Sequence, residues 1–186
     1  QSLRSRGFQI DGIRKKGYRL DQTPSVFDVI KFKKWSKTKV IGIDVRTFKT
    51  LGSTQAYAKS LAGENAPEGL LVLSETQGHG QGRLGRSWTS GAGGLWFSLI
   101  LKPDLAPQNM PGVSLICSLS VQEAIQSLVG LKLSVKWPND VVYKEASTYR
   151  KVCGILLDMS AASDRGHWLV IGIGVIFWIW LRNQRG

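Results

Sequence analysis

The chain has 186 residues, of which 42% are hydrophobic and 20% are charged, a composition that supports one domain of ordinary size with a buried core. Two cysteines, Cys117 and Cys153, and only two histidines argue against a disulfide framework and against a zinc site, and this usage predicts a reducing, cytoplasmic setting. The formal net charge is +12, and the first 50 residues carry most of the excess, which is typical either of an arm that binds phosphate backbones or of a solvated surface.

The first 20 residues predict a small basic element. Their apolar residues lie around three glycines, as expected for a short helix end followed by a two-stranded ribbon. Arg14, Lys15 and Lys16 would lie at the turn of this ribbon. Residues 21–38 are polar and basic, so we expect a connection there.

A strand, a turn and a capped helix open the main domain. Alternation predicts a strand over residues 40–48. Ser53 or Thr54 can cap a helix that continues to Leu61, and Gly63 can stop it by taking the left-handed conformation.

The remaining elements mix strands with one clear helix. We expect strands over 69–74, 94–102, 133–137, 152–159 and 168–173, and a helix over 112–128, where apolar residues recur at helical spacing. A hairpin-like break is expected at 138–140. Because the regular alternation of βαβ units is absent, the order favours an α+β domain with a mixed or largely antiparallel sheet and flanking helices.

The stretch from Gly80 to Gly85 has the spacing G-x-G-x-x-G, which in dinucleotide-binding folds joins a strand to a helix. Three more glycines occupy the place of the helix body, so this interpretation fails. A P-loop fails as well, because no Gly-Lys-Ser/Thr triplet follows. We therefore expect a long glycine-rich loop between two strands.

Arg83, Arg86 and Trp88 give this stretch its chemistry. Arginine forks suit phosphate and carboxylate oxygens, and an indole face suits stacking on a purine. Lys136, at the end of a strand, and the turn that follows it could converge on the same place. The alternative is an ordinary surface loop with solvated arginines.

Five motifs occur in the order and approximate spacing of bacterial biotin protein ligases, and the chain resembles that family. The motifs are GSTQ (52–55), ETQGHGQGRLGRSW (75–88), KWPND (136–140), KVCGIL (151–156) and IGIG (171–174). The resemblance implies a biotin/lipoate ligase-like, class II synthetase-like catalytic domain. It also implies a two-step reaction, in which biotin and Mg²⁺-bound ATP give biotinyl-adenylate, and a lysine of a biotin carboxyl carrier protein then takes the biotinyl group.

The same resemblance implies the site residues. Those expected to bind biotin are Ser53, Thr54, Gln77, Gly80, Arg83, Lys136 and Gly154. Those expected to bind ATP or the adenylate are Arg83, Arg86, Trp88, Asn139 and Gly174. Lys136 and Arg83 are the expected catalytic residues, acting on the carboxylate and α-phosphate oxygens. No protein-bound metal is expected, since Mg²⁺ would enter with ATP.

Residues 1–20 resemble the wing of the winged helix-turn-helix domain that some of these ligases carry, and that subgroup represses biotin synthesis genes. DNA contacts would then come from Arg14, Lys15 and Lys16, with biotin operator DNA as a partner of the full-length parent. The resemblance leaves a homodimer open. No membrane anchor is expected, because the apolar run from Trp168 to Leu181 has 14 residues, short of the roughly 20 that a spanning helix needs.

Two positions depart from the family's pattern. Gln81 replaces an arginine, and Ile176 replaces an asparagine that contacts the adenine edge. Beyond Val175 the resemblance ends, so we expect an incomplete catalytic domain over 40–175, preceded by a linker over 21–39 and followed by an atypical tail over 176–186 from truncation or a frameshift. Two alternatives remain open: a lipoate-type ligase, and a transcription regulator that senses biotin without catalysis.

Overall fold

The computed structural model describes residues 9–13, 17–22, 27–104, 106–160 and 168–176. The chain divides into two units, residues 1–37 and residues 38–186. In the first unit, β1 (Gln9–Ile13) and β2 (Gly17–Gln22) pair antiparallel, which confirms the predicted two-stranded ribbon. Arg14, Lys15 and Lys16 and the predicted helix end lie outside the described residues.

A short helix, α1 (Val29–Trp35), lies within the segment for which the sequence predicts a polar connection. The Asp28 carboxylate caps it by accepting hydrogen bonds from the backbone N–H groups of Ile30 (3.0 Å) and Lys31 (3.1 Å). Lys33 and Lys34 lie in its last turn, where positive charge interacts favourably with the helix dipole. Capping and dipole therefore stabilise a helix that hydrophobic periodicity does not indicate.

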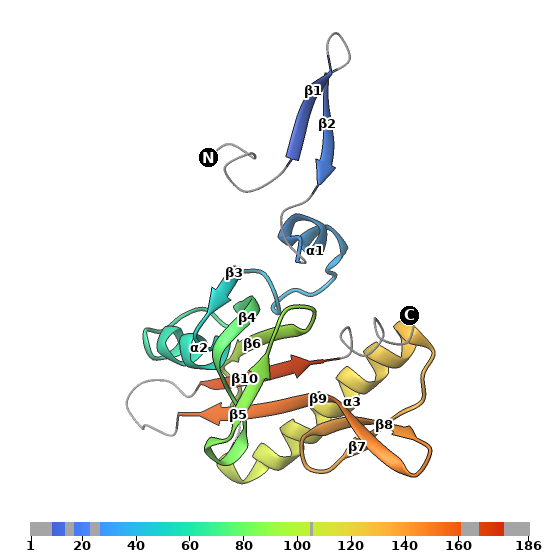
Figure 1. The fold of residues 1–186 in the computed structure, drawn as a ribbon. Coiled ribbons are helices and arrows are strands. Elements are labelled where there is room, and N and C mark those ends of the chain that lie inside the picture. Colours follow the sequence, from blue (N-terminus) through green and yellow to red (C-terminus); the bar gives the residue numbers. More distant parts are fainter. Residues whose placement is uncertain (1–8, 14–16, 23–26, 105, 161–167, 177–186) are drawn as a thin grey trace. The chain divides into compact units, whose positions relative to one another are not determined.

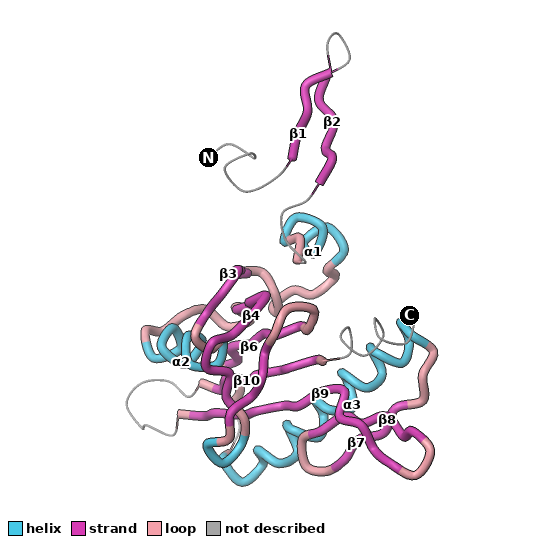
Figure 2. Tube along the Cα trace, viewed as in Figure 1, coloured by secondary structure: helices cyan, strands magenta, loops and turns pink. Residues whose placement is uncertain are grey.

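The second unit contains an eight-stranded sheet among the described residues, drawn in magenta in Figure 2. Its strands are β3 (Val45–Leu51), β4 (Leu71–Gln81), β5 (Ser87–Ser90), β6 (Leu95–Leu101), β7 (Leu133–Lys136), β8 (Asp140–Glu145), β9 (Thr148–Met159) and β10 (Leu169–Val175). The spatial order is β3-β4-β6-β10-β9-β8-β7, and β5 pairs with β4. The β3–β4 pair is parallel and the other pairs are antiparallel, which confirms the predicted mixed sheet.

Strand β10, the last described strand, lies in the middle of the sheet. Each residue from Leu169 to Val175 has one partner on β6 and one on β9. Leu169, Val170 and Ile171 are all buried, as expected for a central strand covered on both faces.

Two helices cover different parts of the sheet (Figure 1). Helix α2 (Thr54–Gly63) contacts β4, β6 and β10, and α3 (Met110–Val129) contacts β7, β8 and β9. Ser53 caps α2, because its Oγ accepts from the N–H of Ala56 at 3.3 Å. The left-handed residue after α2 is Asn65 (φ 64°), so the prediction that Gly63 takes this conformation is wrong.

Helix α3 has an apolar face that the described residues leave exposed. Its segment Pro111–Val129 is the one described helix whose length and composition would suit a membrane span, and 17% of that span is buried. Ile116, Leu119 and Leu128 are exposed. Its contacts with three strands identify α3 as a helix that packs on the sheet.

The glycine-rich stretch is mostly strand, so the prediction of a long loop is wrong. Strand β4 continues to Gln81, a 3₁₀ turn (Arg83–Gly85) follows, and β5 begins at Ser87. Gly80 pairs with Trp88, and a Cβ on Gly80 would collide with the carbonyl oxygen of Trp88. The glycine thus serves the close approach of two strands, which composition alone does not distinguish from a loop.

Candidate functional site

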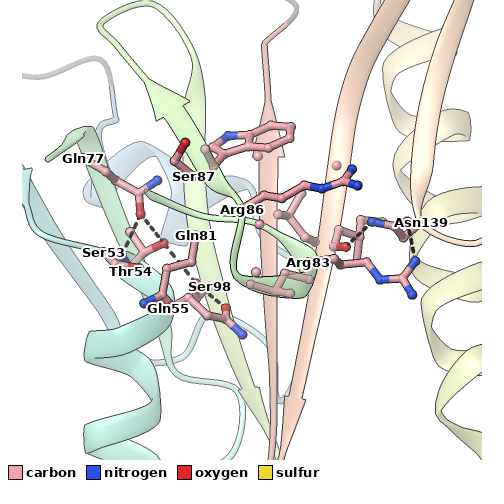
Figure 3. A pocket seen from close by; sticks show the side chains of 18 of the residues that line it. Ser53, Thr54, Gln55, Gln77, Gln81, Arg83, Arg86, Ser87, Ser98 and Asn139 are labelled. Atoms are coloured by element: carbon pink, nitrogen blue, oxygen red, sulfur yellow. Dashed lines mark hydrogen bonds between the residues drawn. The ribbon is translucent and has the colours of Figure 1, made fainter. Parts of the chain in front are cut away.

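A pocket of about 390 Å³ opens between the 3₁₀ turn, the start of α2 and the strands β6, β9 and β10 (Figure 3). Polar and charged side chains from segments far apart in the sequence line it. They are Ser53, Thr54, Gln55, Gln77, Gln81, Arg83, Arg86, Ser87, Ser98, Asn139, Asp140 and Lys151.

One end of the pocket has a polar floor. Gln77 Oε1 accepts hydrogen bonds from the N–H (2.7 Å) and the hydroxyl (3.1 Å) of Thr54, and Gln77 Nε2 donates to Ser90 Oγ at 2.7 Å. Among the described residues, Gln77 donates only this one hydrogen bond from its amide nitrogen. Ser53 Oγ accepts a hydrogen bond from the backbone N–H of Ala56 and donates none to a described residue. The hydroxyl of Ser53 and the second N–H of Gln77 therefore remain available to a ligand with a carbonyl oxygen.

The other end of the pocket is cationic. Arg83 donates from Nη1 to Asn139 Oδ1 at 3.0 Å, and Asn139 Nδ2 donates to the carbonyl of Ile155 at 2.8 Å. The turn between β7 and β8 therefore meets the 3₁₀ turn, as the sequence predicts. Lys151 Nζ lies 2.7 Å from Asp140 Oδ1, and both side chains are partly exposed.

Trp88 also lines the pocket, and its indole packs against two glycines. A Cβ on Gly154 would lie 2.8 Å from the indole, and a Cβ on Gly174 would lie 2.7 Å from Trp88 Nε1. Lys151 Nζ lies 4.6 Å from the ring centroid, within the range of a cation–π contact. Among the described residues, the buried Nε1 of Trp88 has no hydrogen-bond partner.

Residues 47–175, which include every strand of the sheet except the first residues of β3, match the Biotin/lipoate A/B protein ligase family. The chain belongs to this family. The bifunctional ligase/repressor BirA of Bacillus subtilis is 38% identical over 176 residues, which are 94% of this chain and 53% of BirA. The biotin–[acetyl-CoA-carboxylase] ligase of Paracoccus denitrificans is 34% identical over 125 residues, 66% of this chain and 50% of that protein.

A solved structure shares the fold. The biotin protein ligase of Aquifex aeolicus in complex with biotin and ATP matches with a TM-score of 0.58 and 35% sequence identity, over 72% of this chain and 52% of that one. The chain spans about half the length of the curated relatives it matches.

The pocket of this biotin/lipoate ligase family member brings together most of the residues that the sequence predicts. Those that line it are Ser53, Thr54, Gln77, Arg83, Arg86, Trp88, Asn139, Gly154 and Gly174. Gly80 lies beside it, in the β4–β5 hairpin. Lys136 is exposed at the end of β7 and is not among the lining residues.

Lys151 is a charged lining residue that the sequence prediction missed, although its motif was recognised. A β-bulge accompanies its place on the pocket. Val141 pairs with Cys153 and Val142 pairs with Lys151, so the register shifts opposite Val152. Strict alternation would place Lys151 on the face opposite to Gly154, whereas both line the pocket.

Of the two positions that depart from the family's pattern, Gln81 lines the pocket and Ile176 does not. Gln81 lines the pocket, so a neutral amide stands where a cation is expected. Ile176 is not a lining residue, and its backbone N–H donates to the carbonyl of Val152 at 2.9 Å. The tail beyond it, 177–186, lies outside the described residues.

Cys153, two residues after Lys151, is fully buried and is expected to be inert. Burial raises the pKa of its thiol from the ordinary 9.0 to about 12, and the nearby Lys151 ammonium opposes this only in part. The neutral thiol therefore stabilises the fold fully below about pH 9, and this contribution is lost as the pH rises toward 12.

At pH 8, iodoacetamide should leave Cys153 unmodified in the folded chain and alkylate it in denaturant, as mass spectrometry can measure. Rapid alkylation of the folded chain would contradict this burial.

Proposed function

We propose that this chain carries the biotin-activating site of a biotin protein ligase, which uses ATP to form biotinyl-5′-AMP and transfers biotin to a lysine of a carrier protein. The observation that supports this most is the arrangement of one pocket with a hydrogen-bonding floor at one end and cations at the other. A ureido ring has one acceptor and two N–H donors, which match the polar floor. A dithiolane ring, as in lipoate, makes no such hydrogen bonds, so the floor favours biotin.

The positively charged side chains at the other end of the pocket suit the first step of the reaction, the formation of biotinyl-5′-AMP. A carboxylate must approach the α-phosphate of a polyanion, and positive groups aimed at both lower that barrier. Arg83 and Lys151 border the same pocket. We assign the carboxylate and α-phosphate oxygens to these two residues, with Lys151 in the role for which the sequence predicts Lys136, and with Arg86 on the phosphates.

Trp88 is proposed to cover the adenine. The names of the compared proteins support biotin and ATP as substrates and an acetyl-CoA carboxylase carrier domain as the acceptor. Mg²⁺ would arrive bound to ATP. Operator DNA, a homodimer and a cytoplasmic location belong to the same proposal, supported by the likeness to BirA.

The test is biotin-dependent ATP–pyrophosphate exchange by the chain, with lipoate as the control acid and circular dichroism to verify folding. Exchange with biotin and not with lipoate is the expected result.

One observation favours a second function, a biotin sensor without catalysis: Ile176 has an apolar side chain where the family's pattern has asparagine. A folded chain that binds biotin and supports no exchange would favour the sensor.

A further inference from the structure

Gln55 follows Thr54 in the sequence, lines the pocket at its polar floor and is only 3% exposed. Its Nε2 donates to Asp158 Oδ2 at 2.8 Å and to the carbonyl of Val170 at 3.2 Å. Both partners are acceptors when Asp158 is ionised, so the amide must direct its NH₂ group toward them. Its Oε1 consequently faces Ser98.

The amide packs closely against strand β10. A Cβ on Gly172 would collide with Gln55 Oε1, so strand β10 closes that side with bare backbone. The hydrogen bonds therefore set the orientation of the amide, and glycine at position 172 leaves space for it.

Ser98, which is completely buried, links Gln55 to the floor (Figure 3). Its Oγ lies 3.1 Å from Gln55 Oε1 and 3.0 Å from Thr54 Oγ1. A hydroxyl has one proton and can donate to only one of them. Among the described residues, Ser98 is the one donor to Gln55 Oε1, and a buried acceptor without a donor is costly, so the proton is directed to Gln55.

This arrangement determines what Thr54 offers a ligand. Its own proton can go to Gln77 Oε1, 3.1 Å away. With the Ser98 proton directed elsewhere, Thr54 Oγ1 keeps lone pairs for the pocket. We propose that Gln55 is a positioning residue that, through Ser98, holds Thr54 as a hydrogen-bond acceptor for an N–H group of the ureido ring, an inference that rests on the proposed biotin site.

Isothermal titration with biotin tests this. Gln55→Met removes the acceptor, frees the Ser98 proton to donate to Thr54, and should raise the Kd for biotin about tenfold, the worth of one hydrogen bond. Gln55→Glu keeps an acceptor toward Ser98 and should recover most of that affinity, although it melts at a lower temperature because its carboxylate faces Asp158. In both variants the KM for ATP should stay within about twofold.

A double-mutant cycle separates positioning from mere packing. In a Ser98→Ala background Gln55→Met should cause no further loss of biotin affinity, because the Ser98 hydroxyl proton, which would otherwise be freed to donate to Thr54, is absent. Lys59→Met is the matched control: it removes the 3.3 Å ion pair with Asp158 and leaves the Asp158 acceptor in place. If Gln55→Met does not fold, Gln55→Asn, which withdraws the acceptor by one methylene, carries the same expectation.

Three outcomes would count against the inference. A folded Gln55→Met chain with wild-type affinity for biotin overturns it. Equal losses in Gln55→Met and Gln55→Glu overturn it in favour of a packing role. A folded wild-type chain that does not bind biotin overturns the proposed function itself.

Discussion

Replacing Lys151 with glutamine is expected to lower biotin-dependent ATP–pyrophosphate exchange by about 100- to 1,000-fold, the usual loss when one preorganised group is removed from a charged transition state. Lys151 is the lysine that borders the pocket, 2.7 Å from Asp140 and 4.6 Å from the Trp88 ring centroid. Glutamine keeps much of the length and can still donate to Asp140, so the change removes mainly the charge. The fall should be larger in kcat/KM than in biotin affinity measured without ATP.

The matched control is Lys136→Gln, which removes the same charge from the exposed end of β7. It should change the exchange rate by less than about threefold, since exposed charges are screened by solvent. The opposite ranking of the two variants would restore Lys136 as the catalytic lysine and refute the assignment of Lys151.

Replacing Gly174 with alanine is expected to displace Trp88 and raise the KM for ATP by at least about tenfold, which corresponds to the worth of one aromatic contact. The new Cβ would lie 2.7 Å from Nε1 and between 2.9 and 3.0 Å from two ring carbons. The indole packs over Gly154 and Gly174, which are cross-strand partners on β9 and β10, so overpacking should also lower the free energy of unfolding by about 1–3 kcal/mol.

Gly63→Ala is the control for this prediction, because a Cβ there meets no atom within 4 Å. It should leave the KM for ATP unchanged and, within helix α2, stabilise the chain slightly. Trp88→Leu in the Gly174→Ala background should recover stability without recovering ATP affinity. A Gly174→Ala chain with both properties unchanged would show that the indole does not pack against this glycine.

The sequence predicted the strands and the helix that show a clear pattern of apolar residues, either in runs and alternation or at helical spacing. The helix expected over 112–128 is α3 (Met110–Val129), and the strands expected over 133–137, 152–159 and 168–173 are β7, β9 and β10. These segments pack against each other, so their buried faces appear in the sequence as a periodic pattern of apolar residues. Helix α1 and strand β5 were missed, because capping and close backbone pairing stabilise them and neither leaves a periodic pattern.

The site shows the same division. Ser53, Thr54, Gln77 and Arg83 lie within motifs, and the structure places all of them on the pocket. Lys151 depends on a bulge that one strand's sequence does not reveal, because the bulge is a property of its pairing with β8. Gln55 was not predicted, because its hydrogen-bond partners Asp158 and Ser98 lie 103 and 43 positions away in the sequence.

The central place of β10 has a consequence for the order in which this protein can fold during synthesis. Strands β3, β4 and β6 can pair once residue 101 has been made, and β7, β8 and β9 can pair once residue 159 has been made. Nothing else among the described strands bridges these two sheets, since only β10 pairs with both β6 and β9. A nascent chain therefore carries two half-sheets with open edges, at β6 and at β9, until residues 169–175 leave the ribosome and close them together.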